Sequence, residues 1–219
     1  FMELISRLIA FMILIIISPF LLSVSLLILI FDGRPIFYKQ DRVGFRFKIF
    51  KIYKFRTMVK NSGKLLTKQH DKRVTALGEV LRKIKIDEFP QLFNILKGDM
   101  RFIGPRPEVL EFFNQNSFQF LTNIKPGISD YSSILLRDEG KVLACIGGDN
   151  PYLILLPFKL KLANYYSKKK SFLTDLKLVL ITVVSILFPY YSSRSLIAPV
   201  IIRDLPEAQN FLNEYLLKK

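Results

Sequence analysis

One uncharged stretch near the N-terminus limits the folds open to this 219-residue chain more than any other feature. Leu8–Phe31 contains 24 consecutive residues without a charge, and a helix of that length covers the ~30 Å hydrocarbon core of a bilayer. The stretch is longer than the apolar core of a secretory signal, and Asp32-Gly33-Arg34 follows it without a small-residue cleavage site. We therefore expect a retained membrane segment within residues 1–33.

A proline lies in the middle of this stretch. Pro19 lacks the N–H that would bond the Ile15 carbonyl, so a straight helix is interrupted where lipid offers no other donor. The hydroxyl of Ser18 can bond a carbonyl one turn earlier and reduce the cost. The residues alone leave two alternatives open, a kinked spanning helix and a re-entrant hairpin. Cationic flanks, with Arg7 before the stretch and Arg34 after it, favour two cytoplasmic ends.

Most of the net charge of +15 lies between Arg34 and Arg106, where 19 Lys and Arg residues stand against 6 Asp and Glu. This excess predicts an anionic partner: nucleic acid, an anionic membrane surface or a phosphorylated substrate. The single cysteine, Cys145, and the single histidine, His70, exclude an internal disulfide, a cysteine-based zinc site and a two-histidine relay. Catalytic chemistry would therefore use carboxylates, lysines, hydroxyls or that one thiol.

The residue pattern predicts an α+β fold that is mostly helical, with a small β-hairpin and interfacial amphipathic helices. Aromatic and β-branched residues predict strands at 35–40 and 45–58, joined by a turn at Val43-Gly44. Apolar spacing and Pro/Gly signals predict helices at 75–85, 91–97, 155–166 and 173–191. The uncharged part at 178–191 is short for a span and suits a helix lying along the membrane. Residues 61–73 read as a loop in which His70 is solvated.

Two adjacent carboxylates, Asp87 and Glu88, lie in this basic block just before a predicted helix. A helix N-terminus and nearby guanidinium groups favour the ionised form of a carboxylate. An ionised Asp can attack phosphorus, and the pair offers oxygen ligands to a Mg²⁺ ion that carries a diphosphate. Helix capping is the structural alternative. Pro105 and Pro107 fix the backbone on both sides of Arg106. A guanidinium held in this way suits a phosphate group. The structural alternative is that the segment is a rigid surface turn.

Four motifs together resemble those of the bacterial sugar transferases, the monotopic phosphoglycosyl transferases. They are KFRTM at 54–58, LRKIKIDEFPQLFNILKGDM at 81–100, IGPRP at 103–107 and KPGIS at 125–129. The resemblance extends from Ser18-Pro19 to the helix near Leu187. It implies an enzyme that moves a sugar-1-phosphate from a UDP-sugar to polyprenyl (undecaprenyl) phosphate and releases UMP, as the first membrane step of glycan assembly. It also implies a location at the cytoplasmic face of the bacterial inner membrane, among its lipids.

The same resemblance assigns roles to residues. It implies that Asp87 is the nucleophile and forms a phosphosugar intermediate, that Glu88 assists, and that Mg²⁺ bridges the carboxylates and the diphosphate. It places Arg106 on a substrate phosphate and makes Ser18-Pro19 the break of a re-entrant hairpin. Splitting a diphosphate needs charge neutralisation, and we expect further cations at the substrate phosphates: Lys54, Arg56, Arg82 and Arg137.

The chain also departs from the family pattern. Arg101 stands where many members have serine, and residues 127–137 differ from the common GITGWAQVNGR while keeping Arg137, so the sugar stays open. We expect a minimal unit without the multi-span region of some relatives: a membrane-embedded helix at 1–33, a catalytic domain at 34–191, and a tail at 192–219 of unassigned role. Two other classes compete, a membrane-tethered nucleic-acid-binding protein built on the basic block and a non-catalytic scaffold for glycan assembly. The basic block contains no recognised nucleic-acid-binding motif, so we expect no nucleic-acid partner.

Overall fold

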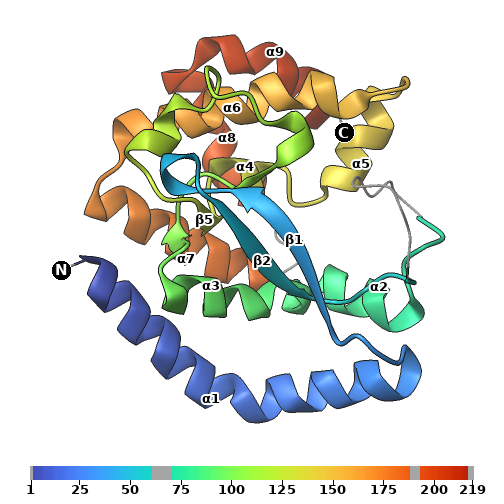
Figure 1. Cartoon of the computed structure of the whole chain (residues 1–219). Helices are drawn as coiled ribbons and strands as arrows, with labels where there is room; N and C mark the ends of the chain where they lie inside the picture. The colour runs from blue at the N-terminus through green and yellow to red at the C-terminus, as the bar shows by residue number, and fades with distance from the viewer. Residues whose placement is uncertain (1, 61–70, 188–192, 217–219) are drawn as a thin grey trace.

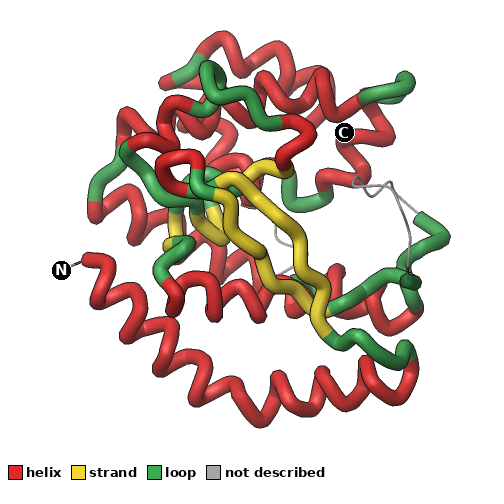
Figure 2. The backbone as a smooth tube through the Cα atoms, in the orientation of Figure 1, coloured by secondary structure: helices red, strands yellow, loops and turns green. Residues whose placement is uncertain are grey.

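Helices form most of the protein and surround two small sheets (Figures 1 and 2). The structure, a computed structural model, describes residues 2–60, 71–187 and 193–216. His70 and most of the predicted loop at 61–73 lie outside the described residues, as do residues 188–191 of the last predicted helix. The predominance of helix is confirmed, and the small sheets lie between the long N-terminal helix and the C-terminal helices (Figure 2).

Helix α1 (Met2–Phe31) contains the apolar stretch and is long and apolar enough to cross a membrane. Most of its large apolar side chains are exposed. Its buried side chains follow one stripe: Ala10, Leu14, Val24 and Ile28. The N-terminal part of this stripe packs against α3, and the C-terminal part packs against β2 and α2. One face of α1 is therefore fixed to the body of the protein, and the remaining faces are free to contact lipid.

Pro19 lies inside α1, which changes direction near its middle (Figure 1). The Ile15 carbonyl, which Pro19 cannot bond, accepts a hydrogen bond of 2.8 Å from the Ser18 hydroxyl. The expected role of Ser18 is confirmed, because this bond satisfies the carbonyl at the point where lipid cannot. The structure has one bent helix in place of two separate ones, and its re-entry into a single membrane face stays a prediction.

The predicted β-hairpin is confirmed, with a longer turn. Strands β1 (Phe37–Val43) and β2 (Ile49–Phe55) pair antiparallel. Their register sets Phe37 opposite Phe55 and Val43 opposite Ile49. The expected start of the second strand at residue 45 is wrong, because η1 (Phe45–Phe47) is a 3-10 turn that the Gly44 N–H closes by bonding the Lys48 carbonyl at 2.9 Å. Aromatic residues at a period of two occur in this turn as well as in the strand, so the pattern alone set the boundary too early.

Short strands that have no detectable sequence period complete the sheets. Strand β4 (Glu108–Val109) pairs with β1 to give the order β2-β1-β4. Strand β3 (Arg101–Ile103) pairs in parallel with β5 (Gly127–Ser129). Between them Gly104 and Gly127 approach so closely that a Cβ on Gly127 would lie 2.2 Å from the Gly104 nitrogen. This contact brings the IGPRP and KPGIS motifs side by side, because only glycine leaves room for it.

The middle of the chain forms the predicted short helices. Helix α2 (Ala76–Lys83) begins after Thr75, whose hydroxyl accepts the Gly78 N–H at 2.9 Å. A 3-10 turn, η2 (Ile86–Gln91), leads into α3 (Leu92–Lys97). Gly98 ends α3 with a φ of 85°, as predicted. Pro90 lies within η2, one residue before the expected helix start at Gln91, and α3 begins at Leu92.

The largest core lies among the C-terminal helices. These are α4 (Tyr131–Leu135), α5 (Glu139–Ile146), α6 (Pro151–Lys169), α7 (Phe172–Leu187), α8 (Ser193–Asp204) and α9 (Gln209–Phe211). Leu135, Leu155 and Tyr166 pack there with Ile201 and Leu212. Two further short elements, η3 (Leu110–Phe112) and η4 (Gln119–Thr122), connect the sheets to this core. Residues of the segment at 192–219, for which the sequence indicated no role, thus contribute to the same core as residues of the segment at 34–191.

Helix α7 is one-sided, as a helix on a membrane surface would be. Leu178 and Ile181 are buried in the core, whereas Leu173, Leu180 and Leu187 are exposed. The predicted helices at 155–166 and 173–191 are confirmed in the described residues, and α6 begins earlier, at Pro151. An interfacial position for α7 stays a prediction.

Asn94 attaches α3 to the outer edge of β2. Its side chain is fully buried, donates to the Lys51 carbonyl at 2.7 Å and accepts the Tyr53 N–H at 3.1 Å. We expect Asn94→Ala to lower the free energy of unfolding by about 2 kcal/mol, because two backbone groups lose their partner. Thermal unfolding in detergent would measure the loss. The matched control is Asn164→Ala on the exposed face of α6, and equal melting temperatures for the two variants would contradict the prediction.

Candidate active site

Glu88 forms the centre of a half-buried charge cluster. One of its carboxylate oxygens, Oε1, accepts the Lys54 ammonium at 2.7 Å and the Arg106 guanidinium at 2.6 Å, and Oε2 lies 3.4 Å from a second nitrogen of Arg106. Burial alone would raise the pKa of Glu88, but Arg106 and Lys54 outweigh it and hold that pKa well below its ordinary value. Glu88 is therefore an anion that joins β2, η2 and the Pro-Arg-Pro segment.

Asp87 precedes Glu88 in the chain, and its surroundings differ from those of Glu88. Its side chain is 8 % exposed, and within the described part of the chain its carboxylate has no hydrogen bond or ion pair. Burial and the negative charge of Glu88 raise its pKa, and the charges of Lys54, Lys85 and Arg82 only partly oppose them. The expectation that nearby cations and a helix N-terminus hold this pKa down is therefore wrong in sign. A desolvated carboxylate without a protein partner is more basic and more nucleophilic than a paired one.

Arg106 reaches Glu88 because both flanks of its segment are fixed. Strand β3 ends at Ile103 and β4 begins at Glu108, so the two sheets hold the Pro-Arg-Pro segment between them. The Pro105 carbonyl accepts the Gly127 N–H at 3.0 Å, and the Pro107 carbonyl accepts a nitrogen of Arg42, also at 3.0 Å. The attraction of Glu88 raises the pKa of Arg106, which keeps its positive charge in the site.

Besides Arg106, the cations Lys54, Arg82 and Lys85 act on the carboxylates. Burial lowers the pKa of Lys54, while Glu88 acts to raise it. Arg82 on α2 donates from Nε to the Thr57 hydroxyl at 2.8 Å, and its charge acts on Asp87. Lys85 precedes η2 in a left-handed conformation and donates to the Arg137 carbonyl at 3.1 Å. The sequence argument did not single out Lys85, although it lies two residues before Asp87.

The guanidinium groups of two expected phosphate ligands have other partners. Arg56 donates to the carbonyls of Asp32, Gly33 and Arg34 at 2.5, 2.7 and 2.9 Å, and so satisfies backbone groups just after α1. The guanidinium of Arg137 donates to the carbonyl and the hydroxyl of Ser185 on α7. The structure thus groups Lys54, Arg82 and Arg106 with the carboxylates. It gives Arg56 and Arg137 contacts to the chain, and their phosphate binding stays a prediction.

A second buried network lies behind Arg106 and has no local signal in the sequence. The Tyr152 hydroxyl donates to Glu108 at 2.5 Å, and Lys159 lies 2.8 Å from that hydroxyl and 3.6 Å from Glu139. Burial would raise the pKa of Glu139, but Lys159 and then Arg106 outweigh it and lower that pKa. Glu139 therefore adds a negative charge near Arg106, although it lies 33 residues further along the chain, a placement that only the fold reveals.

The residues can be tested for their fit to Mg²⁺. No group of three or more His, Cys, Asp or Glu side chains able to hold a metal occurs among the described residues. Magnesium is commonly held by one or two carboxylates together with substrate phosphates, and the unpaired carboxylate of Asp87 suits that arrangement. Glu88 offers less, because Lys54 and Arg106 already occupy its oxygens.

A helix-rich protein with an apolar N-terminal helix and a carboxylate pair among buried cations is what the motif resemblance predicts. Residues 1–189 match the family described as bacterial sugar transferase. The chain belongs to the bacterial sugar transferase family.

Three relatives illustrate the range of the family. The chain is 41% identical over 126 residues to a UDP-N-acetylgalactosamine-undecaprenyl-phosphate N-acetylgalactosaminephosphotransferase of Aeromonas hydrophila, a match that covers 54% of this chain and 30% of the relative. It is 35% identical over 167 residues to the exopolysaccharide production protein ExoY of Sinorhizobium fredii, covering 67% of this chain and 74% of ExoY. It is 35% identical over 133 residues to the UDP-glucose:undecaprenyl-phosphate glucose-1-phosphate transferase of Escherichia coli, covering 57% and 29%. The chain thus matches less than a third of the Aeromonas and Escherichia relatives.

The opposite pKa shifts of the two carboxylates predict opposite effects on stability. Because the folded-state pKa of Asp87 is raised, its ionised form lowers stability at neutral pH, and the penalty disappears below the unfolded-state pKa, where both states are protonated. We expect Asp87→Asn to raise the melting temperature at pH 7 and this gain to vanish in acid. Glu88→Gln leaves Lys54 and Arg106 without their anion and should cost about 3 kcal/mol at pH 7.

Thermal unfolding of the full chain in detergent between pH 4 and 8 would measure both effects. Exposed Asp138 provides the matched control, since Asp138→Asn removes the same charge at the surface. A lower melting temperature for Asp87→Asn than for Asp138→Asn at pH 7 would contradict the strain assigned to Asp87.

Proposed function

We propose that this chain transfers a sugar-1-phosphate from a UDP-sugar to undecaprenyl phosphate and releases UMP. The observation that carries the proposal is the pair of adjacent carboxylates. Asp87 is buried and has no hydrogen bond or ion pair among the described residues, and Glu88 is held by Lys54 and Arg106. Family membership supports the reaction class, and the printed names of the Aeromonas and Escherichia relatives describe transfer of sugar phosphates to undecaprenyl phosphate.

In the first step, an oxygen of Asp87 attacks the phosphorus that carries the sugar. A bond forms between this oxygen and phosphorus, the diphosphate bond to the uridine side breaks, and UMP leaves with the bonding electron pair. The product is a phosphosugar ester of the Asp87 carboxylate. Desolvation of Asp87 supports this role, because it strengthens the carboxylate as a nucleophile without a base to activate it.

In the second step, a phosphate oxygen of undecaprenyl phosphate attacks the same phosphorus. The bond to Asp87 breaks, the carboxylate is regenerated, and the new diphosphate links the sugar to the lipid. Both steps exchange one phosphorus–oxygen bond for another and need no histidine as a proton carrier. The chain contains a single histidine, His70, and the proposal gives it no role.

The cations of the site would stabilise the charge that develops on the phosphate oxygens. Arg106 presents a planar fork that suits phosphate, and Lys54 adds a point charge from β2. Glu88 positions both through its ion pairs at 2.6 and 2.7 Å, which is the assisting role we propose for it. Mg²⁺, when bound, would neutralise diphosphate charge. Asp87 would be its main protein ligand, with Glu88 the weaker one because Lys54 and Arg106 already bind its oxygens.

We further propose that α1 re-enters the cytoplasmic face of the inner membrane and that α7 lies along it. The Ser18 bond to the Ile15 carbonyl supports a bend within lipid, and the exposed apolar side of α7 supports contact with the same bilayer. Undecaprenyl phosphate keeps its tail in the membrane, so a half-embedded enzyme can hold Asp87 at the height of the lipid phosphate.

The covalent step predicts a trapped intermediate. The full chain in detergent, incubated with Mg²⁺ and a panel of UDP-sugars but no lipid acceptor, should gain the mass of one sugar phosphate in intact-mass spectra. Peptide mapping should place the adduct on Asp87. Asp87→Asn should show no adduct and should lower UMP release in the presence of acceptor by about 1,000-fold or more.

Lys141→Gln, on the exposed side of α5, is the control that should keep both signals. UMP release that requires acceptor and leaves only unmodified protein would favour direct transfer and exclude the intermediate. Absence of UMP release with every UDP-sugar and acceptor would contradict the transferase itself and favour the scaffold hypothesis.

The membrane proposal predicts that both ends of α1 face the cytoplasm. With Cys145, the native exposed thiol, replaced by serine, single cysteines at Leu4 and at Lys48 report the start of α1 and the β-hairpin. An impermeant maleimide added to spheroplasts should label neither, and it should label both after the inner membrane is opened. Labelling of Leu4→Cys in intact spheroplasts, with Lys48→Cys protected, would show instead that α1 spans the membrane.

A further inference from the structure

Arg7, in the first turns of α1, carries a guanidinium that lacks an acceptor. Its Nε is buried without a hydrogen-bond partner, and the described part of the chain provides no ion pair or hydrogen bond for the rest of the group. The guanidinium lies against Gly98, where a Cβ would be 2.0 Å from one of its nitrogens. Glycine at this position, already required by the φ of 85° that ends α3, thus also makes room for Arg7.

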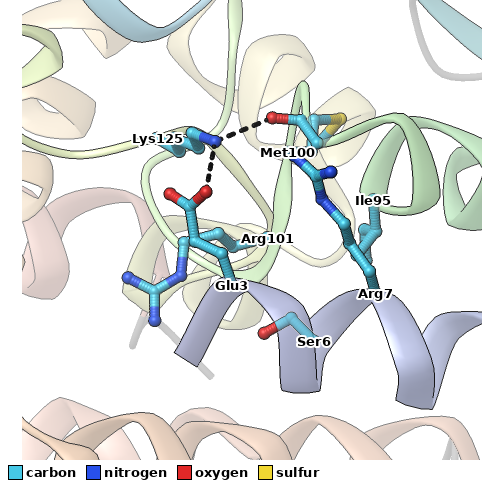
Figure 3. A pocket seen from close by; sticks show the side chains of 8 residues that line it. Glu3, Ser6, Arg7, Ile95, Met100, Arg101 and Lys125 are labelled. Atoms are coloured by element: carbon cyan, nitrogen blue, oxygen red, sulfur yellow. Dashed lines mark hydrogen bonds and ion pairs between the residues drawn. The ribbon is translucent and has the colours of Figure 1, made fainter. Parts of the chain in front are cut away.

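Other cations line the same pocket, a shallow one open to solvent, whose empty space of about 180 Å³ includes the solvent in front of it. Lys125, just before β5, and Arg101, in β3, belong to its wall together with Glu3 and Arg7 (Figure 3). Lys125 donates to the Glu3 carboxylate and to the Gly98 carbonyl, each at 3.0 Å. Arg101 lies 3.5 Å from Asp175 on α7.

A further cation is close to this pocket. Burial and then the like charge of Arg101 lower the pKa of Lys170, which indicates that these two side chains share one region of positive potential. The pocket therefore combines an excess of positive charge with a guanidinium that has no acceptor among the described residues. Its Nε is enclosed, and an unpaired buried donor is costly. The two terminal nitrogens of Arg7 are not enclosed in this way, and they are the donors that an external anion would reach.

We propose that this pocket binds a phosphate group, with Arg7 as its principal ligand and Lys125 and Arg101 as supporting charges. A guanidinium offers two parallel donors to a phosphate, and the bond is charge-assisted. The group can come from a phospholipid headgroup or from free phosphate. The exposed side chains of Leu4 and Leu8, on the same turns of α1 as Arg7, place acyl chains within reach and favour the headgroup.

The two carboxylates near the pocket compete with such a ligand unequally. Asp175 is held by the Tyr166 hydroxyl at 2.6 Å, so it stays in place beside Arg101. Glu3 is 56 % exposed as a side chain and belongs to the first turn of α1, so it can leave Lys125 when a phosphate arrives. Glu3 therefore acts as a weak internal competitor for the ligand.

This pocket is separate from the carboxylate pair. It lies where α3 ends, at Gly98, whereas Asp87 and Glu88 lie in η2, before α3 begins. A bound headgroup would fix the N-terminal arm of α1 to the body of the protein at the level of the lipid phosphates. The inference does not require the proposed transfer reaction, and its readout is binding without a UDP-sugar.

Native mass spectrometry of the full chain in non-ionic detergent tests the pocket. The probes are phosphatidylglycerol, diacylglycerol with the same acyl chains, and inorganic phosphate. The wild-type chain should bind one phosphatidylglycerol in preference to diacylglycerol. Arg7→Gln should weaken this binding about tenfold, the loss expected for one charge-assisted contact. Lys141→Gln, which removes a distant surface charge, should leave it unchanged.

The same experiment distinguishes the two possible sources of the phosphate group, a lipid headgroup and free phosphate. Displacement of phosphatidylglycerol by millimolar inorganic phosphate, with retention of phosphate by the wild-type chain but not by Arg7→Gln, would identify free phosphate as the ligand. Retention of the lipid against inorganic phosphate would identify the headgroup. Equal phosphatidylglycerol binding by the wild-type chain and Arg7→Gln would overturn the proposal.

Glu3→Gln keeps every cation and provides an independent check in case Arg7→Gln does not fold. Removal of the competing carboxylate should strengthen phosphatidylglycerol binding severalfold. Unchanged or weaker phosphatidylglycerol binding in Glu3→Gln would overturn the site, because releasing Lys125 from Glu3 would then have contributed nothing to binding.

Discussion

The architecture around the candidate active site depends on the ion pairs of Glu88. Its carboxylate binds Lys54 from the hairpin and Arg106 from the segment between the two sheets, at 2.7 and 2.6 Å. Three parts of the chain that are distant in sequence are thereby held at one point. Buried ion pairs of this kind stabilise a protein weakly overall but are costly to break, so their value here is positional. Among the described residues, they leave the neighbouring Asp87 without a hydrogen bond or ion pair of its own.

Further contacts fix the two chain segments that carry Lys54 and Arg106. Asn94 satisfies both backbone groups at the edge of β2 and so fixes the strand that carries Lys54 to α3. The close approach of Gly104 and Gly127 fixes the segment that carries Arg106. These contacts show how the four motifs act together in this chain: each supplies either a charged group or the backbone surface that positions one. The chemistry and the scaffold are therefore encoded in the same short segments.

Much of the site could be predicted from the sequence because its charged residues lie in long, specific motifs. Asp87, Glu88, Lys54 and Arg106 do meet, and Ser18 does bond the carbonyl freed by Pro19. Other features could not be predicted. Whether a cation such as Arg56 faces a site or a helix end is decided by tertiary contacts, and the direction of the Asp87 pKa is decided by burial, which a list of neighbouring charges does not contain. Glu139 and Lys159 approach through packing of α5 on α6, which leaves no local pattern.

The single buried stripe of α1 has a mechanical consequence. Ala10 and Leu14 pack into the cluster that contains Leu92 and Ile95 of α3, and Val24 and Ile28 pack against Phe55 and Leu81. An α1 embedded in a thinner or thicker bilayer would tilt to match its hydrophobic length, and the packed stripe would carry α3 and its preceding turn along with it. The height of the Asp87 carboxylate above the acyl chains would then follow the thickness of the host membrane. Bilayer thickness would thus reach the candidate active site through the geometry of one helix.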